Sequence, residues 1–157
     1  MLYDEVGFGL TAFSSLRDRF ILNTQDFGEY YRAIEEGRLP LNRGLKRDLD
    51  QQIRWAIVLP LKNRDVYKKT FQRSTGGKSL NDLFRPKIER LKSYGLLQES
   101  DRSLGLTELG TFFADEVAHQ FHHADYIPHP REAYADGPLN PYHDTDPFVA
   151  EPVVAVA

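Results

Sequence analysis

The sequence predicts a mainly α-helical protein with a small β-wing, and two features of the chain indicate this fold class. Apolar residues recur at helical spacing through most of residues 25–121, and one strand–turn–strand pattern interrupts them. From residue 122 the periodicity stops and prolines become frequent, which is typical of extended or disordered segments. We therefore expect three segments, which are residues 1–44, 45–121 and 122–157.

The composition is that of an ordinary globular protein, with 157 residues of which 41% are hydrophobic and 27% are charged. The net charge of −3 argues against a nucleic acid or an anionic membrane as partner. No apolar run approaches the roughly 20 residues of a membrane span, and no signal-peptide pattern is present, so we expect a cytoplasmic protein. The chain contains no cysteine, which excludes disulfides and cysteine-ligated iron–sulfur clusters within it.

The first element that we expect is a short strand over Glu5–Phe13, which carries Gly7 and Gly9 and ends in a loop. Two glycines followed by small residues allow a backbone to approach a flat or charged ligand closely. The alternative is a glycine-rich strand end without a ligand, and local sequence alone favours it. A dinucleotide-binding fingerprint does not apply, because the third glycine is missing. Since only one other strand-forming region is visible, we expect this strand to belong to a sheet outside the chain.

Two helices follow in the sequence. The first is expected over Gln25–Glu36, and Gly37 is a natural C-terminal stop. Residues 38–44 are expected to form a connector. The second helix is expected over Lys46–Leu61, and Pro60 limits or kinks its end.

A short helix over residues 65–71 and a glycine turn at residues 74–77 come next. They lead to a helix over residues 80–94, which Ser79 caps. Its apolar stripe consists of Leu80, Leu83, Phe84, Ile88 and Leu91.

The wing is expected at residues 96–99 and 103–106, which flank a turn. Thr107 then caps a last helix that runs to about Phe121. Its predicted core stripe consists of Leu109, Phe112, Phe113 and Val117. The order helix, helix, wing, helix is that of a winged-helix-like domain.

Four basic residues lie on the helix expected over residues 80–94. In a DNA-binding winged helix this element would enter the major groove. Such residues more often form a solvated face, and Asp82 and Glu89 dilute the positive charge here. The four residues are Arg85, Lys87, Arg90 and Lys92.

Histidines cluster where the last helix is expected to end, and a further one, His129, follows in the tail. His119 and His123 are four residues apart, so they could share one helix face and ligate a metal or a haem iron. His122 lies between them, but no acidic residue completes a recognisable set of ligands. A polar helix end is the favoured interpretation, and we assign no metal ligand.

Several short motifs stand in a characteristic order. They are GFGLTAFS at 7–14, FGEYY at 27–31, LPLNRG at 39–44, KIERL at 87–91, YGLL at 94–97 and LTELG at 106–110. In this order and spacing, residues 3–121 resemble the C-terminal region of the oxygen-independent coproporphyrinogen III oxidase family of radical S-adenosylmethionine (radical SAM) enzymes.

The resemblance implies a role for the opening stretch. It would close the catalytic radical SAM barrel, so that the strand and first helix come from the end of that barrel. Gly7, Gly9, Ala12 and Phe13 would then line the S-adenosylmethionine pocket, with Phe13 in contact with the cofactor. The helical domain would cover the barrel mouth and shape the site for a tetrapyrrole substrate.

The family reaction belongs to porphyrin and haem biosynthesis. A 5′-deoxyadenosyl radical abstracts hydrogen from propionate side chains of coproporphyrinogen III, and oxidative decarboxylation leaves vinyl groups. The cluster and the cofactor carry this chemistry, while the protein positions the reactants and closes the site to water.

One departure from the family limits what the chain does alone. The family's CxxxCxxC motif holds a [4Fe-4S] cluster in the barrel, and this chain has no cysteine. We therefore expect a fragment or partial gene product that has no catalytic residue of its own and needs the missing barrel as partner. A binding module, either a winged-helix DNA binder or a haem-handling protein, is the alternative.

Overall fold

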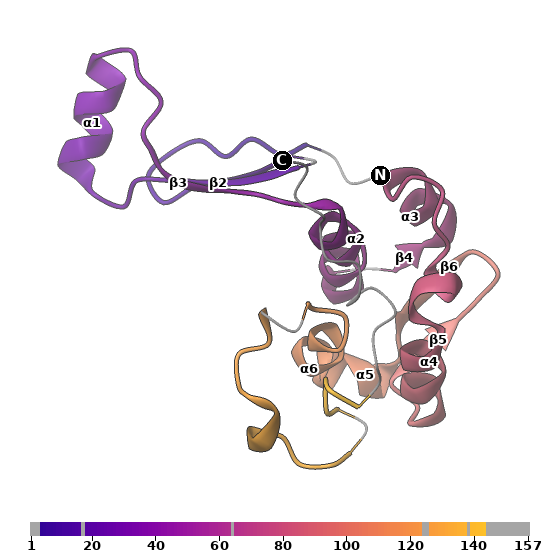
Figure 1. Cartoon of the computed structure of the whole chain (residues 1–157). Helices are drawn as coiled ribbons and strands as arrows, with labels where there is room; N and C mark the ends of the chain where they lie inside the picture. Colours follow the sequence, from indigo (N-terminus) through magenta and orange to yellow (C-terminus); the bar gives the residue numbers. More distant parts are fainter. Residues whose placement is uncertain (1–3, 17, 64, 124–125, 138, 144–157) are drawn as a thin grey trace, which may run out of the picture. The chain divides into compact units, whose positions relative to one another are not determined.

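The computed structural model describes residues 4–16, 18–63, 65–123, 126–137 and 139–143. The chain divides into two compact units, Met1–Gln52 and Ile53–Ala157, and each is described by itself (Figure 1). The first unit contains β1 (Phe13–Leu16), β2 (Arg19–Asn23), α1 (Phe27–Glu35), β3 (Leu41–Lys46) and the start of α2 (Leu49–Asn63). The second contains the rest of α2, β4 (Val66–Tyr67), α3 (Lys68–Ser74), α4 (Leu80–Ser93), β5 (Leu97–Glu99), β6 (Ser103–Leu106), α5 (Glu108–Phe112), α6 (Ala114–His119) and the 3-10 turn η2 (Arg131–Ala133).

The first unit is built on a three-stranded antiparallel sheet in the order β1-β2-β3. The prediction of a strand over Glu5–Phe13 is wrong in position, because only Glu5 forms a bridge, to Ser15, and β1 begins at Phe13. The sheet partners of β1 also lie within the chain. The expected connector forms β3, which the pattern did not reveal because all of its residues are exposed and show no alternation.

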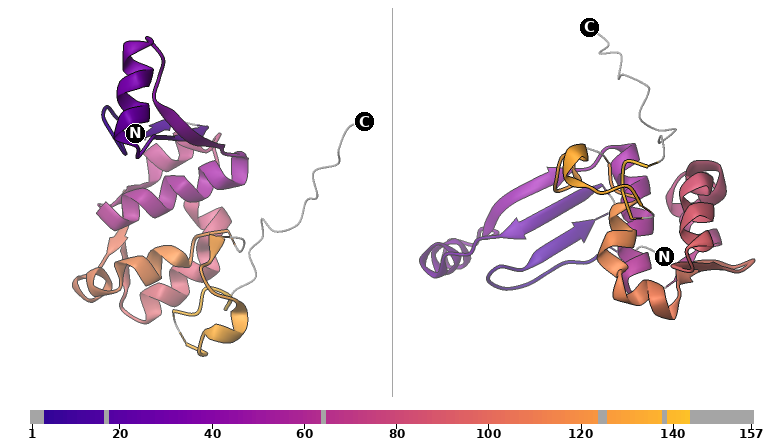
Figure 2. Two further views of the ribbon diagram at one scale, coloured as in Figure 1. Left: turned by 90° about the vertical axis from the view of Figure 1, so that its left-hand side faces the viewer. Right: turned by 90° about the horizontal axis from the view of Figure 1, so that it is seen from below.

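Helix α1 begins and ends close to the predicted positions. Asp26 caps its N-terminus by accepting a hydrogen bond from the backbone N–H of Glu29 at 2.7 Å. Gly37 follows its end with a φ of 66°, a conformation that favours glycine. Ala33 is the buried residue of α1. The helix lies beyond one end of the strands of this unit (Figure 2).

The second unit combines helices α2, α3 and α4 with a second antiparallel sheet in the order β4-β6-β5. The strand–turn–strand pattern predicted for the wing is present as the antiparallel pair β5 and β6. The short helix begins later than predicted, at Lys68, because Val66 and Tyr67 pair with β6 instead. The buried core includes Ile53, Ile57, Leu61, Val66, Phe71, Phe84, Ile88, Leu91, Leu104, Val117 and Phe121.

Both predicted caps of this unit are present. The Ser79 hydroxyl accepts from the N–H of Asn81 at 3.2 Å, and the Thr107 hydroxyl accepts from the N–H of Gly110 at 2.9 Å. The helix after Thr107 is nevertheless two helices, α5 and α6, which meet at Phe113.

The predicted core stripe of that last helix is wrong for its first turn. Val117 is buried, but Leu109 and Phe112 are exposed, and Phe113 is partly so. The cause is Gly110, where a Cβ atom would lie 2.0 Å from the carbonyl oxygen of Leu96. The glycine side of α5 therefore faces the protein, and its large residues point outward.

Part of the segment predicted as a proline-rich, extended or disordered tail makes defined contacts. The buried Gln120 side chain donates to the carbonyl oxygen of Leu139 at 2.8 Å, and Asn140 is buried. The rest of that prediction concerns residues 144–157, which lie outside the described residues. Within the described part of the chain, no helix has the length and apolar character needed to cross a membrane.

Candidate functional site

The glycine-containing stretch forms a loop that Asn23, at the end of β2, holds in place. The Asn23 side-chain amide donates to the carbonyl oxygen of Gly9 at 2.8 Å, and its backbone N–H donates to the carbonyl oxygen of Ala12 at 2.8 Å. Next to it, the N–H of Thr11 donates to the carbonyl oxygen of Thr24 at 3.0 Å. Hydrogen bonds to residues 23 and 24, at the end of β2, therefore hold residues 7–12 in place without a ligand.

Both glycines of the loop are required by the fold itself. A Cβ atom on Gly7 would lie 2.3 Å from the carbonyl oxygen of Phe13, and Gly9 has a φ of 109°. The N–H of Gly7 donates to the hydroxyl of Ser14 at 3.1 Å. At Gly7 the loop approaches the backbone of Phe13 closely, whereas at Gly9 the requirement is the positive φ.

Phe13 begins an apolar sheet surface that we call the Phe13 face. Directly opposed residues of antiparallel strands point to the same side, so Phe13, Leu22 and Arg43 form one row of this face. The next row is Ser15, Phe20 and Leu45. The rings of Phe13 and Phe20 are 5.4 Å apart, and 56% of the Phe13 surface remains exposed.

Arg47 secures the second row of the Phe13 face. Its guanidinium lies 5.7 Å from the centre of the Phe20 ring and donates to the carbonyl oxygen of Leu16 at 3.1 Å and to the Ser15 hydroxyl at 3.4 Å. Burial lowers the pKa of Arg47, and the nearby Asp18 partly offsets this effect. The charge of Arg47 is thus engaged in holding the sheet together.

Large apolar side chains of the first unit are unusually exposed. A surface of this kind is typical of a protein that meets a partner or a ligand. The exposed residues are Val6, Phe8, Phe13, Phe27, Tyr31, Ile34, Leu39, Leu41, Leu45 and Leu49.

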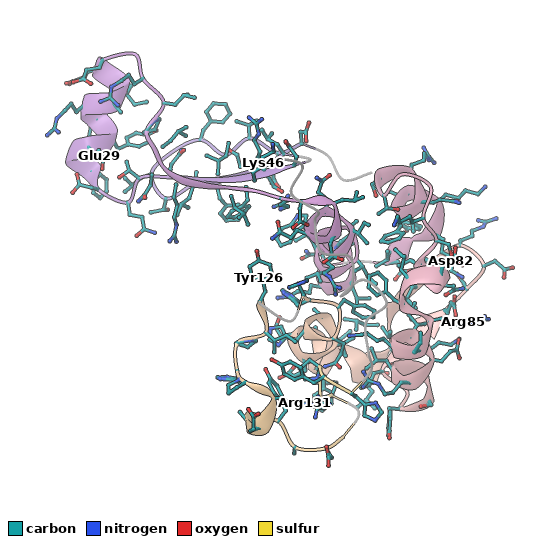
Figure 3. The ribbon with its side chains drawn as sticks, in the orientation of Figure 1. Glu29, Lys46, Asp82, Arg85, Tyr126 and Arg131 are labelled. Atoms are coloured by element: carbon teal, nitrogen blue, oxygen red, sulfur yellow. The ribbon has the colours of Figure 1, made fainter. Side chains whose placement is uncertain are left out.

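The four basic residues of α4 differ in exposure and in their contacts. Lys87 is buried, and its ammonium donates to the carbonyl oxygen of Gln120 at 2.7 Å. Arg90 donates to the side-chain oxygen of the same glutamine at 3.1 Å. Lys92 bonds to Glu99, whose hydrogen bond is the main cause of its raised pKa. Arg85 is exposed on the helix surface (Figure 3).

The histidines pair differently from the sequence hypothesis. The rings of His119 and His122 are 5.4 Å apart, whereas His123 lies beside Tyr126. His129 lies further along, next to Tyr134.

Burial, reinforced by the positive groups of His119, Lys62 and Arg54, lowers the pKa of His122 to about 4. Among the described residues, no group of three or more His, Asp or Glu side chains is arranged to hold a metal ion.

Sequence reasoning missed the residues that build the site around the loop, namely Asn23, Arg43 and Arg47. Their importance depends on the pairing of β1, β2 and β3. The only local signal is that Asn23 stands just before the Asp26 cap of α1, where a strand must end.

Comparisons with known proteins give consistent results. No family model matches the chain. The chain is 25% identical over 123 residues to the oxygen-independent coproporphyrinogen III oxidase of Pseudomonas aeruginosa, which covers 75% of this chain and 26% of that protein. The enzyme of the same name from Helicobacter pylori is 25% identical over 122 residues, and that from Synechocystis is 26% identical over 127 residues.

A solved structure matches as well. It is coproporphyrinogen III oxidase (HemN) from Escherichia coli, a radical SAM enzyme, with a TM-score of 0.55, 20% identity and coverage of 75% of this chain and 28% of that chain. The structural match shows a shared fold. Together, the matches confirm that this chain resembles the C-terminal region of the oxygen-independent coproporphyrinogen III oxidase family. The chain spans about a quarter of the length of the relatives it matches.

Proposed function

We propose that this chain is the C-terminal, substrate-covering module of a coproporphyrinogen III oxidase-like radical SAM protein. Residues 1–44 would complete the barrel and connect it, residues 45–121 would cover the tetrapyrrole, and residues 122–157 would follow as a tail. The observation that carries the proposal is the exposed Phe13 at the start of β1, next to a loop fixed by Asn23, within a unit in which many large apolar residues are exposed. The similarity to an oxidase of which the matched residues cover 26% supports it.

The topology of the second unit supports a winged-helix-like domain. Its elements follow the order α2, β4, α3, α4, β5, β6, and the short strand β4 pairs with β6 rather than with β5. A helix pair followed by a hairpin wing is the arrangement that the sequence motifs predict. In this proposal the wing serves a tetrapyrrole enzyme rather than DNA, since Lys87, Arg90 and Lys92 are engaged within the unit.

The residues of the loop fit a part of an S-adenosylmethionine site. Phe13 offers an exposed aromatic surface on which an adenine or a sulfonium-bearing chain would pack. Gly7, Gly9 and Ala12 would form the backbone wall beside it, held in shape by Asn23. When bound and reductively cleaved, S-adenosylmethionine supplies the 5′-deoxyadenosyl radical.

The [4Fe-4S] cluster does not fit this chain. Such a cluster needs cysteine thiolates, and the sequence contains none. We therefore derive no catalytic step within the chain. Its own residues would position the cofactor and exclude water, while a partner with the cysteines would supply the radical chemistry.

A reconstitution experiment tests this proposal. The radical SAM barrel of the Pseudomonas aeruginosa relative, prepared without its C-terminal quarter and loaded with its cluster, is mixed with this chain. With S-adenosylmethionine and a reductant, we expect conversion of coproporphyrinogen III to protoporphyrinogen IX only when both proteins are present. Phe13→Asp is expected to reduce this activity at least tenfold, and the exposed control Arg73→Gln, in the second unit, is expected to leave it unchanged.

The opposite results would contradict the proposal. A mixture no more active than the barrel alone would show that the chain does not complete such an enzyme. Equal losses in Phe13→Asp and Arg73→Gln would show that the Phe13 face has no particular role.

A further inference from the structure

An exposed arginine stands at the free edge of the Phe13 face. Arg43, on β3, is opposite Leu22, which is in turn opposite Phe13 on β1. Adjacent strands are about 4.8 Å apart, so the Cα atoms of Phe13 and Arg43 are separated by roughly 10 Å. The arginine and the exposed phenylalanine therefore flank one stretch of apolar surface over Leu22.

The two arginines of this face differ in what their charges do. Arg47 is buried and holds Ser15, Leu16 and the Phe20 ring. The Arg43 side chain is exposed and, among the residues that the structure describes, makes no hydrogen bond or ion pair. A guanidinium that the fold does not use remains available to a ligand.

The acidic group of this face lies at the opposite edge. Glu5 pairs with Ser15, so its side chain belongs to the Phe13 face beyond β1, and two strands, β1 and β2, separate it from Arg43 on β3. The face therefore carries a negative charge at one edge and a positive charge at the other. An anionic group of a ligand is favoured at the β3 edge, and a cationic group at the β1 edge.

We propose that Arg43 binds a carboxylate of the ligand that packs on Phe13, and so sets the orientation of that ligand. This inference rests on the proposed function, which supplies the ligand. The planar guanidinium is suited to a bidentate contact with a carboxylate. Two carboxylates are available in the proposed reaction, the methionine carboxylate of S-adenosylmethionine and a propionate of the tetrapyrrole.

Ligand titration of the full chain, followed by the NMR signals of residues 7–23, tests the assignment. The probes are S-adenosylmethionine, 5′-methylthioadenosine, which keeps the adenosine thioether but has no carboxylate, and coproporphyrin III, a stable oxidised tetrapyrrole with propionates. The variants are Arg43→Gln and the control Lys46→Gln, an exposed charge on the opposite face of the same strand.

We expect Arg43→Gln to weaken the binding of the carboxylate ligand by roughly three- to tenfold, as for an exposed charged hydrogen bond. Binding of 5′-methylthioadenosine should not change, and Lys46→Gln should behave like the wild type for all three probes. If the loss is seen with S-adenosylmethionine, the carboxylate is that of the cofactor. If it is seen with coproporphyrin III, the carboxylate is a propionate.

Three results would overturn the assignment. They are wild-type affinity of Arg43→Gln for both carboxylate probes, equal weakening by Lys46→Gln, and no binding of either probe to the wild-type chain. The reconstitution assay separates this failure from that of the proposed function. An active mixture in which Arg43→Gln changes neither kcat nor KM would leave the function standing and remove the role of Arg43.

Discussion

The side-chain amide of Asn23 donates to the carbonyl oxygen of Gly9 at 2.8 Å, although the two residues are 14 positions apart in the sequence. The backbone N–H of the same residue donates to the carbonyl oxygen of Ala12. One buried residue thus fixes both ends of the loop that precedes Phe13. The shape of the candidate cofactor loop therefore depends on Asn23 as well as on the two glycines.

Replacing Asn23 by alanine should loosen this loop without unfolding the protein. The change removes the 2.8 Å hydrogen bond and leaves the Gly9 carbonyl with only the longer bond from the N–H of Ala12, at 3.4 Å, at a cost of about 1 kcal/mol. We expect faster hydrogen exchange at Thr11, whose N–H bonds to Thr24, and unchanged exchange in α4. Asn42→Ala, on the exposed strand β3, is the matched control. Unchanged protection of Thr11 in Asn23→Ala would show that the loop is held by other contacts.

The ion pairs of Glu99 should make the free energy of unfolding depend on pH in the acidic range. Lys68 donates to its carboxylate at 2.7 Å and Lys92 at 2.9 Å, and these hydrogen bonds lower the pKa of Glu99 from 4.5 to about 2. Because the pKa is lower in the folded state, the stabilisation is complete above pH 4.5 and is lost as the pH falls from about 4.5 through 2. Glu99→Gln should therefore lower the free energy of unfolding by about 1–2 kcal/mol at neutral pH.

Urea unfolding at pH 7, 4 and 3 measures this effect. The difference between wild type and Glu99→Gln should be largest at pH 7 and shrink toward pH 3. Glu89→Gln, which removes an exposed i, i+3 partner of Lys92, should change stability by less than about 0.5 kcal/mol. A difference between Glu99→Gln and wild type that stays constant over this pH range would mean that the ion pairs do not stabilise the wing.

The contrast between α4 and β3 shows how far the sequence predicts this structure. Helix α4 has a capping serine and an apolar stripe that is buried, and these local features predict it almost to the residue. Strand β3 is fully exposed, so neither alternation nor apolar content marks it, and only its pairing with β2 makes it a strand. The Phe13 face could not be predicted for the same reason. Its members are brought together by register across three strands, and the sequence specifies register only weakly where a strand such as β3 shows no alternation of apolar and polar residues.

Gly110 explains why the core stripe predicted for the helix after Thr107 is wrong in its first turn. The spacing of Leu109, Phe112 and Phe113 fits a core stripe, but the contact of Gly110 with the Leu96 carbonyl turns these residues outward. An added methyl group at Gly110 would lie 2.0 Å from that oxygen, so Gly110→Ala should destabilise the protein by about 1–3 kcal/mol.

The thermal midpoint of unfolding tests the role of Gly110. Gly137→Ala is the matched control, because a Cβ atom there meets nothing within 4 Å. We expect the thermal midpoint of Gly110→Ala to be clearly lower than that of the wild type. The midpoint of Gly137→Ala should be close to that of the wild type. Equal midpoints for Gly110→Ala and the wild type would show that α5 does not need its close approach to the wing.

Gln120 connects α6 to the segment that follows it through its buried side chain. Its side-chain amide donates to the carbonyl oxygens of Glu116 at 3.0 Å and Leu139 at 2.8 Å, and its side-chain oxygen accepts from Arg90. Gln120 is fully buried, so leucine at this position would keep much of the volume but remove these three hydrogen bonds from a buried site.

Limited trypsin digestion at neutral pH reports whether Gln120 holds residues 126–143 in place. Arg131 is exposed in η2 (Figure 3), and we expect cleavage there to become about tenfold faster in Gln120→Leu, which corresponds to about 1.4 kcal/mol of lost docking. Cleavage after Arg102, at the tip of the wing, is the internal control for general unfolding and should not change. Gln98→Leu, which removes a single exposed hydrogen bond to Leu106, is the control variant. Equal cleavage after Arg131 in Gln120→Leu and the wild type would show that the segment is held by its aromatic contacts, such as Tyr134 with Tyr142, rather than by the buried amide.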